Sequence, residues 1–192
     1  GAELNNMAEA FDRSLRLKDF ECAGLQGALH EKSVQVGAII SIMSFAGRSL
    51  AQSEVFGFAV GEAVLAAGAD TGAVYALEDG VLKLKAHSGL NGSFSAKAGT
   101  LSFMPADRSL VIEDIDSLEE PLRGVLKSAG SSIAAIVPLV YNSVPTGILL
   151  AAYRDPAKFK LQHFRFFEAV AASISVASGH SGLFQKEHST RK

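Results

Sequence analysis

The sequence predicts an α+β fold in which a mainly antiparallel sheet has layers above and below it. Residues 133–141 and 146–153 form two apolar segments joined by a short polar loop. The first segment is apolar on both faces, which is typical of a strand buried on both sides at the centre of a sheet. Because Pro145 cannot donate a ladder hydrogen bond, we expect the second strand to begin near Thr146. Helical segments before and after the strands provide the covering layers.

A long helix is predicted from residue 3 to about residue 50. Its apolar side chains form a row with a seven-residue repeat, namely Leu15, Cys22, Leu29, Val36, Met43 and Leu50. Gly24 and Gly27 each weaken this helix by up to ~1 kcal/mol. Two interpretations stay open: a coiled-coil helix that pairs with another chain, or an amphipathic helix that packs on its own domain.

The middle of the chain alternates helix and strand signals. Ser53 is the expected N-cap of a second helix, 54–67, which ends at Gly68. The two strands after it are expected at 71–77 and 81–87, and the second should place Leu82, Leu84 and Ala86 on one face and Lys83, Lys85 and His87 on the other. An irregular segment rich in Gly and Ser follows, and then a strand, a helix closed by Gly130, the apolar hairpin and a last helix from about Leu161. The ranges of the first three are 88–105, 110–114 and 118–129.

Composition narrows the function classes. The 192 residues suffice for one domain with some additional helix, and the formal net charge of −2 does not favour nucleic acid or an anionic membrane as a partner. No apolar run reaches the ~20 residues that span a bilayer. Cys22 is the single cysteine, which excludes an internal disulfide and fits a reducing cytoplasm. Since the chain starts with Gly, we expect it to be a fragment of a longer protein.

Three stretches, in this order, resemble the GAF domain, a sensory module. Residues 65–75 (LAAGADTGAVY) are similar to its junction of helix and first strand, residues 130–140 with 147–150 to its closing hairpin, and residues 166–171 (FFEAVA) to its final helix. The resemblance implies an antiparallel sheet of five or six strands, with a helix bundle on one face and a loop and short helix as cover on the other. PAS domains share this architecture but lack the helix before the sheet, so they rank second.

The resemblance also implies an organisation and a role. Residues 1–50 would be a signalling and dimerisation helix, 51–178 the sensory domain, and 179–192 a helix end or tail leading to an effector domain. The whole would regulate a bacterial signalling protein, such as a sensor histidine kinase of a two-component system. Because the terminal helices carry apolar stripes, we expect a homodimer through them.

The pocket of such a domain would lie under a cover formed by residues 89–130. We expect its ligand, an unidentified small molecule, to be lined by Tyr75, Phe103, Arg108, Ser131 and Ser132. Arg108 is suited to a carboxylate or phosphate, but a structural pairing with Asp107 or Asp114 is the favoured alternative.

Several subtypes of the family are disfavoured by absent residues. Bilin attachment and methionine sulfoxide reduction need thiols in the pocket, and the sole cysteine lies in the first helix. His87 is a conceivable haem ligand, but its neighbours in phase are lysines, which favours a solvated histidine. We therefore predict no cofactor, no metal site and no catalytic residue. A domain without ligand that serves only dimerisation is the alternative function, and an enzyme has the least support.

Overall fold

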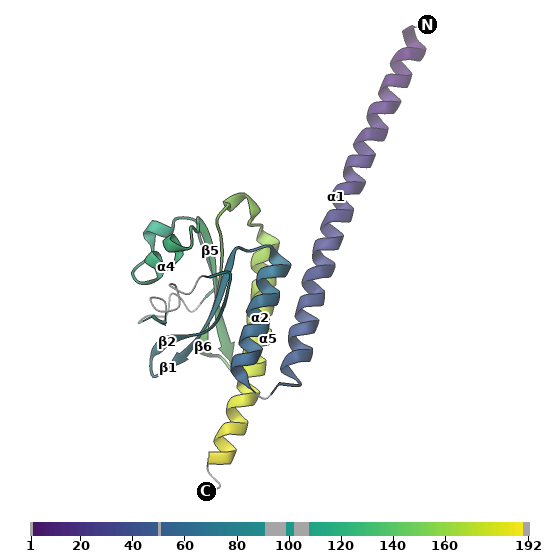
Figure 1. Ribbon diagram of the computed structural model, residues 1–192. Coiled ribbons are helices and arrows are strands. Elements are labelled where there is room, and N and C mark those ends of the chain that lie inside the picture. The colour runs from purple at the N-terminus through teal and green to yellow at the C-terminus, as the bar shows by residue number, and fades with distance from the viewer. Residues whose placement is uncertain (1, 50, 91–98, 102–107, 190–192) are drawn as a thin grey trace. The chain divides into compact units, whose positions relative to one another are not determined.

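The computed structural model describes residues 2–49, 51–90, 99–101 and 108–189, with side chains described for 13–49, 51–90, 99–101 and 108–178 (Figure 1). The helices and strands are, in order, α1 (Ala2–Ala46), α2 (Gln52–Ala67), β1 (Thr71–Glu78), β2 (Val81–Ser88), β3 (Thr100–Leu101), β4 (Leu110–Ile112), the 3-10 helix η1 (Ile115–Ser117), α4 (Leu122–Ser128), β5 (Ile133–Tyr141), β6 (Val144–Tyr153), the 3-10 helix η2 (Pro156–Lys158) and α5 (Leu161–Ser189). None of the described helices is long and apolar enough to cross a membrane.

The sheet has six strands in the order β3-β2-β1-β6-β5-β4, and every neighbouring pair is antiparallel. The apolar hairpin β5–β6 lies in its interior, which confirms the predicted α+β class. The start of β6 differs from the prediction, since the strand already begins at Val144. Pro145 stands opposite Val140, where the register shifts, so its missing N–H falls at an irregular end of the ladder.

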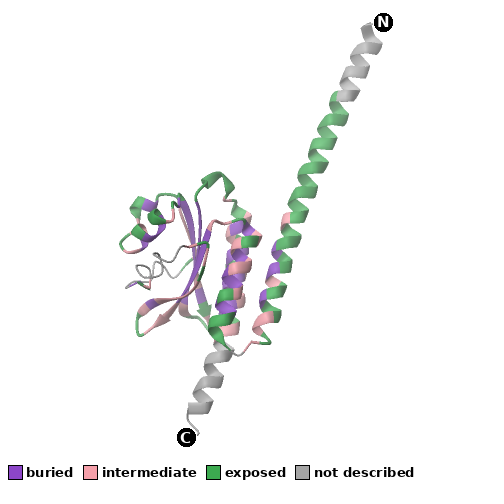
Figure 2. Cartoon of the chain, viewed as in Figure 1, coloured by how far each residue is buried: buried purple, intermediate pink, exposed green. Residues whose placement is uncertain are grey.

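Helices α2 and α5 cover one face of the sheet (Figures 1 and 2). Their buried side chains form one cluster with the strand residues that point to this face, among them Val74 of β1, Leu149 of β6 and Phe167 of α5. The last turns of α1 contribute Ala38 and Ile42 to the same cluster. A helix bundle on one face is therefore confirmed.

The second face of the sheet has its own apolar cluster. Tyr75 of β1 and Ile148 of β6 pack there with Ile115 of η1 and with Leu122 and Leu126 of α4. The cover on this side thus includes a short helix, as predicted. Two other stretches of the predicted cover are edge strands of the sheet instead, namely β4 and β3, the latter within the segment predicted to be irregular, and residues 91–98 and 102–107 lie outside the described residues.

The elements of this cover are shorter than the sequence predicted. Strand β4 ends at Ile112 instead of residue 114, because the carboxylate of Asp114 accepts a hydrogen bond from the amide N–H of Asp116 and so caps η1. Helix α4 begins at Leu122 instead of residue 118. The residue before a proline is disfavoured in the helical conformation, so Glu120 ends the preceding segment and Pro121 takes the N-cap position.

Two further local predictions were wrong. The strict alternation in β2 fails, because the register between β1 and β2 shifts after Val74 and leaves Lys85 as an extra residue. Ala86 consequently packs against the cluster under the helices, whereas Leu82 and Leu84 belong to the opposite face. The N-cap of α2 is Ala51 rather than Ser53, while Gly68 ends the helix in the left-handed conformation, as predicted.

The chain forms two compact units, Gly1–Val36 and Gly37–Lys192. The first unit is the N-terminal part of α1, and its described apolar side chains are solvent-exposed, as for Leu29 at 68%. The second unit holds the sheet and all other elements. The last turns of the long helix thus belong with the sheet domain.

Candidate functional site

Tyr75 is the polar residue at the centre of the second face of the sheet. Its side chain is fully buried in the apolar cluster on that face, and its hydroxyl makes no hydrogen bond with the residues that the structure describes. Burial away from water disfavours the phenolate and raises the pKa of the Tyr75 hydroxyl to about 12. At neutral pH the group is therefore a neutral phenol that can donate one hydrogen bond.

Ser131 and Ser132 lie where the chain leaves α4 and enters β5. Ser131 is buried, and its hydroxyl also has no partner among the described residues. Its amide donates to the carbonyl of Leu126 and so helps to close α4. Ser132 is exposed, and its amide donates to the carbonyl of Tyr153, which starts the ladder between β5 and β6.

The strand register separates Tyr75 from this serine pair. Tyr75 stands opposite Ile148 of β6, which in turn stands opposite Pro138 of β5. Ser131 precedes Pro138 by seven residues, or roughly 23 Å at about 3.3 Å per residue. The structure thus places Ser131 just before the first residue of β5 and Tyr75 near the middle of the sheet, so the two buried hydroxyls lie far apart.

Of the two other predicted lining residues, Arg108 is described and Phe103 lies outside the described residues. Arg108 is exposed and precedes Leu110, the residue of β4 that pairs with Ile136. Since β4 runs antiparallel to β5, Arg108 lies level with Pro138 and therefore level with Tyr75 along the strands.

Tyr153 and His163 are buried polar residues that the sequence analysis did not single out. The Tyr153 hydroxyl donates to the carbonyl of Ala67 at 3.1 Å and lies 3.2 Å from Nδ1 of His163, and the two rings stack. This group ties the end of β6 to α2 and α5 in the cluster under the helices. The alternation of side chains along β6 could have predicted that Tyr153 faces the helices, because Tyr153 is in phase with Leu149 and lies on the face opposite to Ile148.

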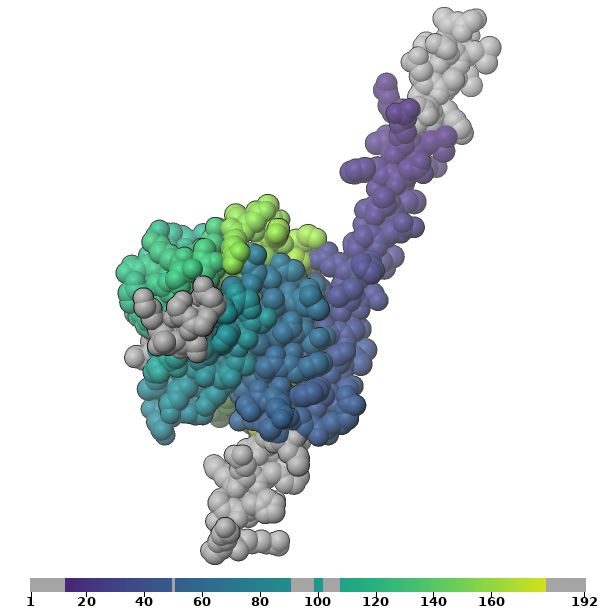
Figure 3. Space-filling model, viewed as in Figure 1, coloured from purple at the N-terminus to yellow at the C-terminus, as the bar shows by residue number. Residues whose placement is uncertain are grey.

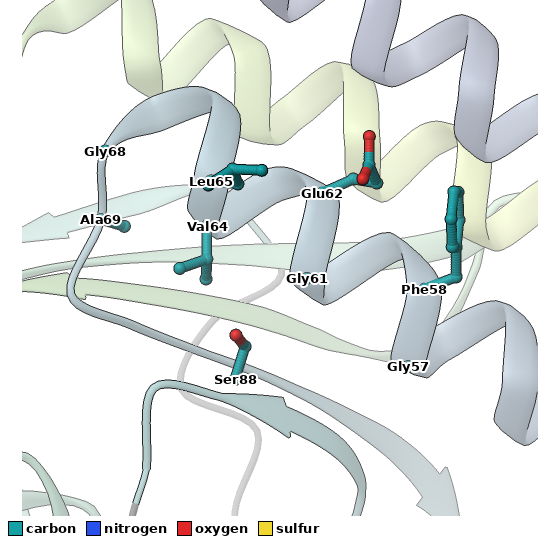
Figure 4. A pocket seen from close by; sticks show the side chains of 9 residues that line it. All are labelled: Gly57, Phe58, Gly61, Glu62, Val64, Leu65, Gly68, Ala69 and Ser88. Atoms are coloured by element: carbon teal, nitrogen blue, oxygen red, sulfur yellow. The ribbon is translucent and has the colours of Figure 1, made fainter.

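A shallow depression of about 530 Å³ follows the outer side of α2 (Figure 4). Gly57 and Gly61 leave its floor free of side chains, Phe58 and Glu62 rise on one side, and Ser88 of β2 lies on the other. In Figure 3 this surface of α2 is the blue area that faces the viewer. It belongs to the helical side of the sheet, so it is separate from the predicted pocket around Tyr75.

The other residues that the sequence raised have local structural roles. His87 is exposed at the end of β2. Asp116 forms an ion pair with Lys127, and Asp114 caps η1. Within the described part of the chain, no three His, Cys, Asp or Glu side chains are grouped so that they could hold a metal ion.

Comparison with known proteins identifies the fold. No family model and no curated protein matches the sequence. Among solved structures, the GAF domain of a phosphoenolpyruvate-protein phosphotransferase from Coxiella burnetii is 16% identical with a TM-score of 0.66, and the match covers 79% of this chain and 96% of that one. A domain of a putative two-component sensor histidine kinase from Sinorhizobium meliloti is 17% identical with a TM-score of 0.60, covering 72% and 96%.

The phycoerythrobilin-bound GAF domain of a cyanobacterial phytochrome is a third similar structure, at 13% identity and a TM-score of 0.64, with 79% of this chain and 97% of that chain covered. At these identities the likeness concerns the fold. The chain has the GAF fold, which confirms the resemblance seen in the three sequence stretches.

Proposed function

We propose that the chain is the regulatory GAF domain of a bacterial signalling protein, that it binds a small molecule at the second face of its sheet, and that it passes the signal on through its flanking helices. The observation that carries the proposal is the buried hydroxyl of Tyr75, which packs with aliphatic side chains and has no hydrogen-bond partner among the residues that the structure describes. A buried donor without a partner costs free energy, and a ligand that accepts its hydrogen bond removes this cost.

The proposed output is a homodimer formed by the outer face of α1. On this face Val36, Ile40 and Met43 are 55%, 59% and 60% exposed, although the opposite face of the same turns packs on the domain through Ala38 and Ile42. The exposed row continues the seven-residue repeat of Leu29 upstream. An apolar row of this spacing is suited to pairing with a second helix. In this proposal the outer face of α1 forms a coiled coil with another chain, and the opposite face of its last turns packs on its own domain. A ligand could act by favouring one of two helix packings.

The alternative is a GAF domain that binds no ligand and serves only as a dimerisation module. The aliphatic content of the second face favours this reading, because Leu82, Leu101, Ile136, Ile148 and Leu150 are all buried there. We give it second place, since a purely structural core has no need for the hydroxyl of Tyr75.

We further propose that the domain is not itself an enzyme and works in the cytoplasm as part of a two-component system. Among the described residues, Tyr75 has no base or nucleophile within hydrogen-bond reach. The histidine kinase neighbour and the single cysteine support the remaining points.

The test is a search for the ligand on the purified full chain. Mass spectrometry after denaturation shows whether a small molecule co-purifies, and a thermal-shift screen with nucleotides, amino acids, haem and neutral metabolites covers weaker ligands. A ligand at 100 times its Kd should stabilise the fold by ~2.7 kcal/mol. No hit in either assay, together with a dimer, would favour the ligand-free alternative.

A further inference from the structure

We propose that the second face of the sheet selects an uncharged, largely apolar ligand with one hydrogen-bond acceptor, and that the hydroxyl of Tyr75 recognises this acceptor. The inference rests on the proposed function, since it names the ligand class of that site. It comes from the chemistry of the cluster around Tyr75.

The first step of the argument is the protonation state of Tyr75. Because burial raises the pKa of its hydroxyl to about 12, the side chain is neutral throughout the physiological range and keeps its proton. A neutral phenol without a partner can donate to a carbonyl, ether or similar oxygen. The group is fully buried, so the acceptor has to reach it inside the cluster rather than at the surface.

The second step is the absence of Asp, Glu, Lys and Arg from the buried residues that the structure describes. The buried polar side chains there are Gln35, Thr71, Ser131, His163 and Ser175, and His163 contacts Tyr153 on the helical side of the sheet. The apolar residues that pack with Tyr75 are aliphatic, namely Ala73, Leu82, Leu101, Ile115, Leu122, Leu126, Ala134, Ile136, Ile148, Leu150 and Ala152. Lys83 lies between Leu82 and Leu84 in β2, so its side chain points away from this cluster, and it forms an ion pair with Glu78. An ionised ligand group in this environment would lose its hydration without gaining a counter-charge, which is strongly unfavourable.

The third step concerns the predicted anion site at the cover. Arg108 is exposed, and it lies across β6 and β5 from Tyr75, at the edge where β4 begins. A carboxylate or phosphate held by Arg108 would remain in water, outside the cluster. The buried part of the ligand is therefore neutral whether or not Arg108 contributes.

The experiment compares three probes of similar size on the full chain by titration calorimetry: acetophenone, which has a carbonyl acceptor, ethylbenzene, which has none, and benzoate, which is charged. We expect acetophenone to bind about tenfold more tightly than ethylbenzene, the equivalent of one net hydrogen bond. We expect benzoate to bind at least tenfold more weakly than acetophenone.

The matched variants are Tyr75→Phe, which removes only the hydroxyl, and Tyr141→Phe, which removes the hydroxyl of a partly exposed tyrosine at the end of β5. Tyr75→Phe should reduce the preference for acetophenone over ethylbenzene to about onefold and leave ethylbenzene binding unchanged. Tyr141→Phe should leave the tenfold preference intact. Shifts of the Tyr75 resonances in the wild-type chain locate the ketone independently, should Tyr75→Phe fail to fold.

The inference is overturned if the preference persists in Tyr75→Phe, if benzoate binds as tightly as acetophenone, or if acetophenone does not bind up to its solubility limit. In each of these cases a nucleotide or amino acid found by the thermal-shift screen would leave the sensory function standing. If that screen is also empty, the sensory function fails with the inference.

Discussion

The outer row of α1 gives the sharpest prediction for the proposed dimer. We expect the double substitution Ile40→Asp and Met43→Asp to convert the chain into a monomer. Both side chains lie on the face of α1 that points away from the domain, with 59% and 60% of their surface exposed. Their replacement removes apolar contacts between two copies and leaves the core of each copy intact.

The magnitude follows from the exposed fractions. Full burial of such a side chain stabilises by about 1.5–3 kcal/mol, so covering the exposed part of Ile40 or Met43 is worth about 1–2 kcal/mol. A two-fold axis repeats each residue, and the four side chains together contribute on the order of 4–7 kcal/mol to association. At 1.4 kcal/mol per factor of ten, the Kd of the dimer should rise by about three to five orders of magnitude.

The assay is sedimentation equilibrium over a dilution series, combined with thermal unfolding monitored by circular dichroism. Ser41→Asp is the matched control, because Ser41 is an exposed residue of the same turn and lies off the apolar row. The control should remain dimeric, and the unfolding midpoint of the double variant should fall only as far as dissociation explains. A double variant that sediments like the wild type would refute the assignment of this face as the interface.

Three further predictions concern stability. Gly147→Ala places a Cβ 2.0 Å from the carbonyl oxygen of Tyr75 on the neighbouring strand, so it should destabilise the fold by about 3 kcal/mol or more. Gly61→Ala is the control: its Cβ meets no atom within 4 Å, and it should stabilise α2 by up to ~1 kcal/mol. Urea unfolding measures both changes, and equal effects would contradict the packing of β1 on β6. The folded state keeps the proton of Tyr75 until about pH 12, whereas the unfolded state releases it near pH 10. The free energy of unfolding of the wild type should therefore fall by about 2–3 kcal/mol between pH 10 and pH 12. The Tyr75→Phe variant should lack this loss. Hydrogen bonding to Lys85 lowers the pKa of Glu78, so this pair stabilises the fold above pH ~4.5, and the stabilisation disappears as the pH falls through the lowered pKa. Since the Glu78 side chain is 41% exposed, Glu78→Gln should lower the free energy of unfolding by less than ~1 kcal/mol at pH 7 in the same assay.

Much of the fold could be predicted because local patterns coincide with it. The hairpin β5–β6 is apolar on both faces, which only an interior position in a covered sheet satisfies. Gly68 ends α2 because a left-handed residue closes a helix most readily without a Cβ. The predictions failed where pairing with a neighbouring strand determines which face a side chain occupies. Alternation within β2 could not show that Lys85 is the extra residue in its pairing with β1.

The candidate site was predictable to a smaller extent. Tyr75 could be found from its phase in an apolar strand, and the structure places it in the apolar cluster on the second face. Its distance from Ser131 could not be found, because it depends on the pairing of β1 with β6 and of β6 with β5. The sequence offered both residues as lining of one pocket, whereas the register places Tyr75 near the middle of the sheet and Ser131 before the start of β5.

By itself the sequence determined the class of fold, the order of its elements and the apolar row of α1, because each of these depends on side-chain periodicity within one segment. The tertiary structure alone decided which face of each strand meets the helices, and that the buried hydroxyl of Tyr75 has no hydrogen-bond partner among the described residues. These properties depend on register and on contacts between residues far apart in the chain, and a shift of one residue in a strand exchanges its two faces.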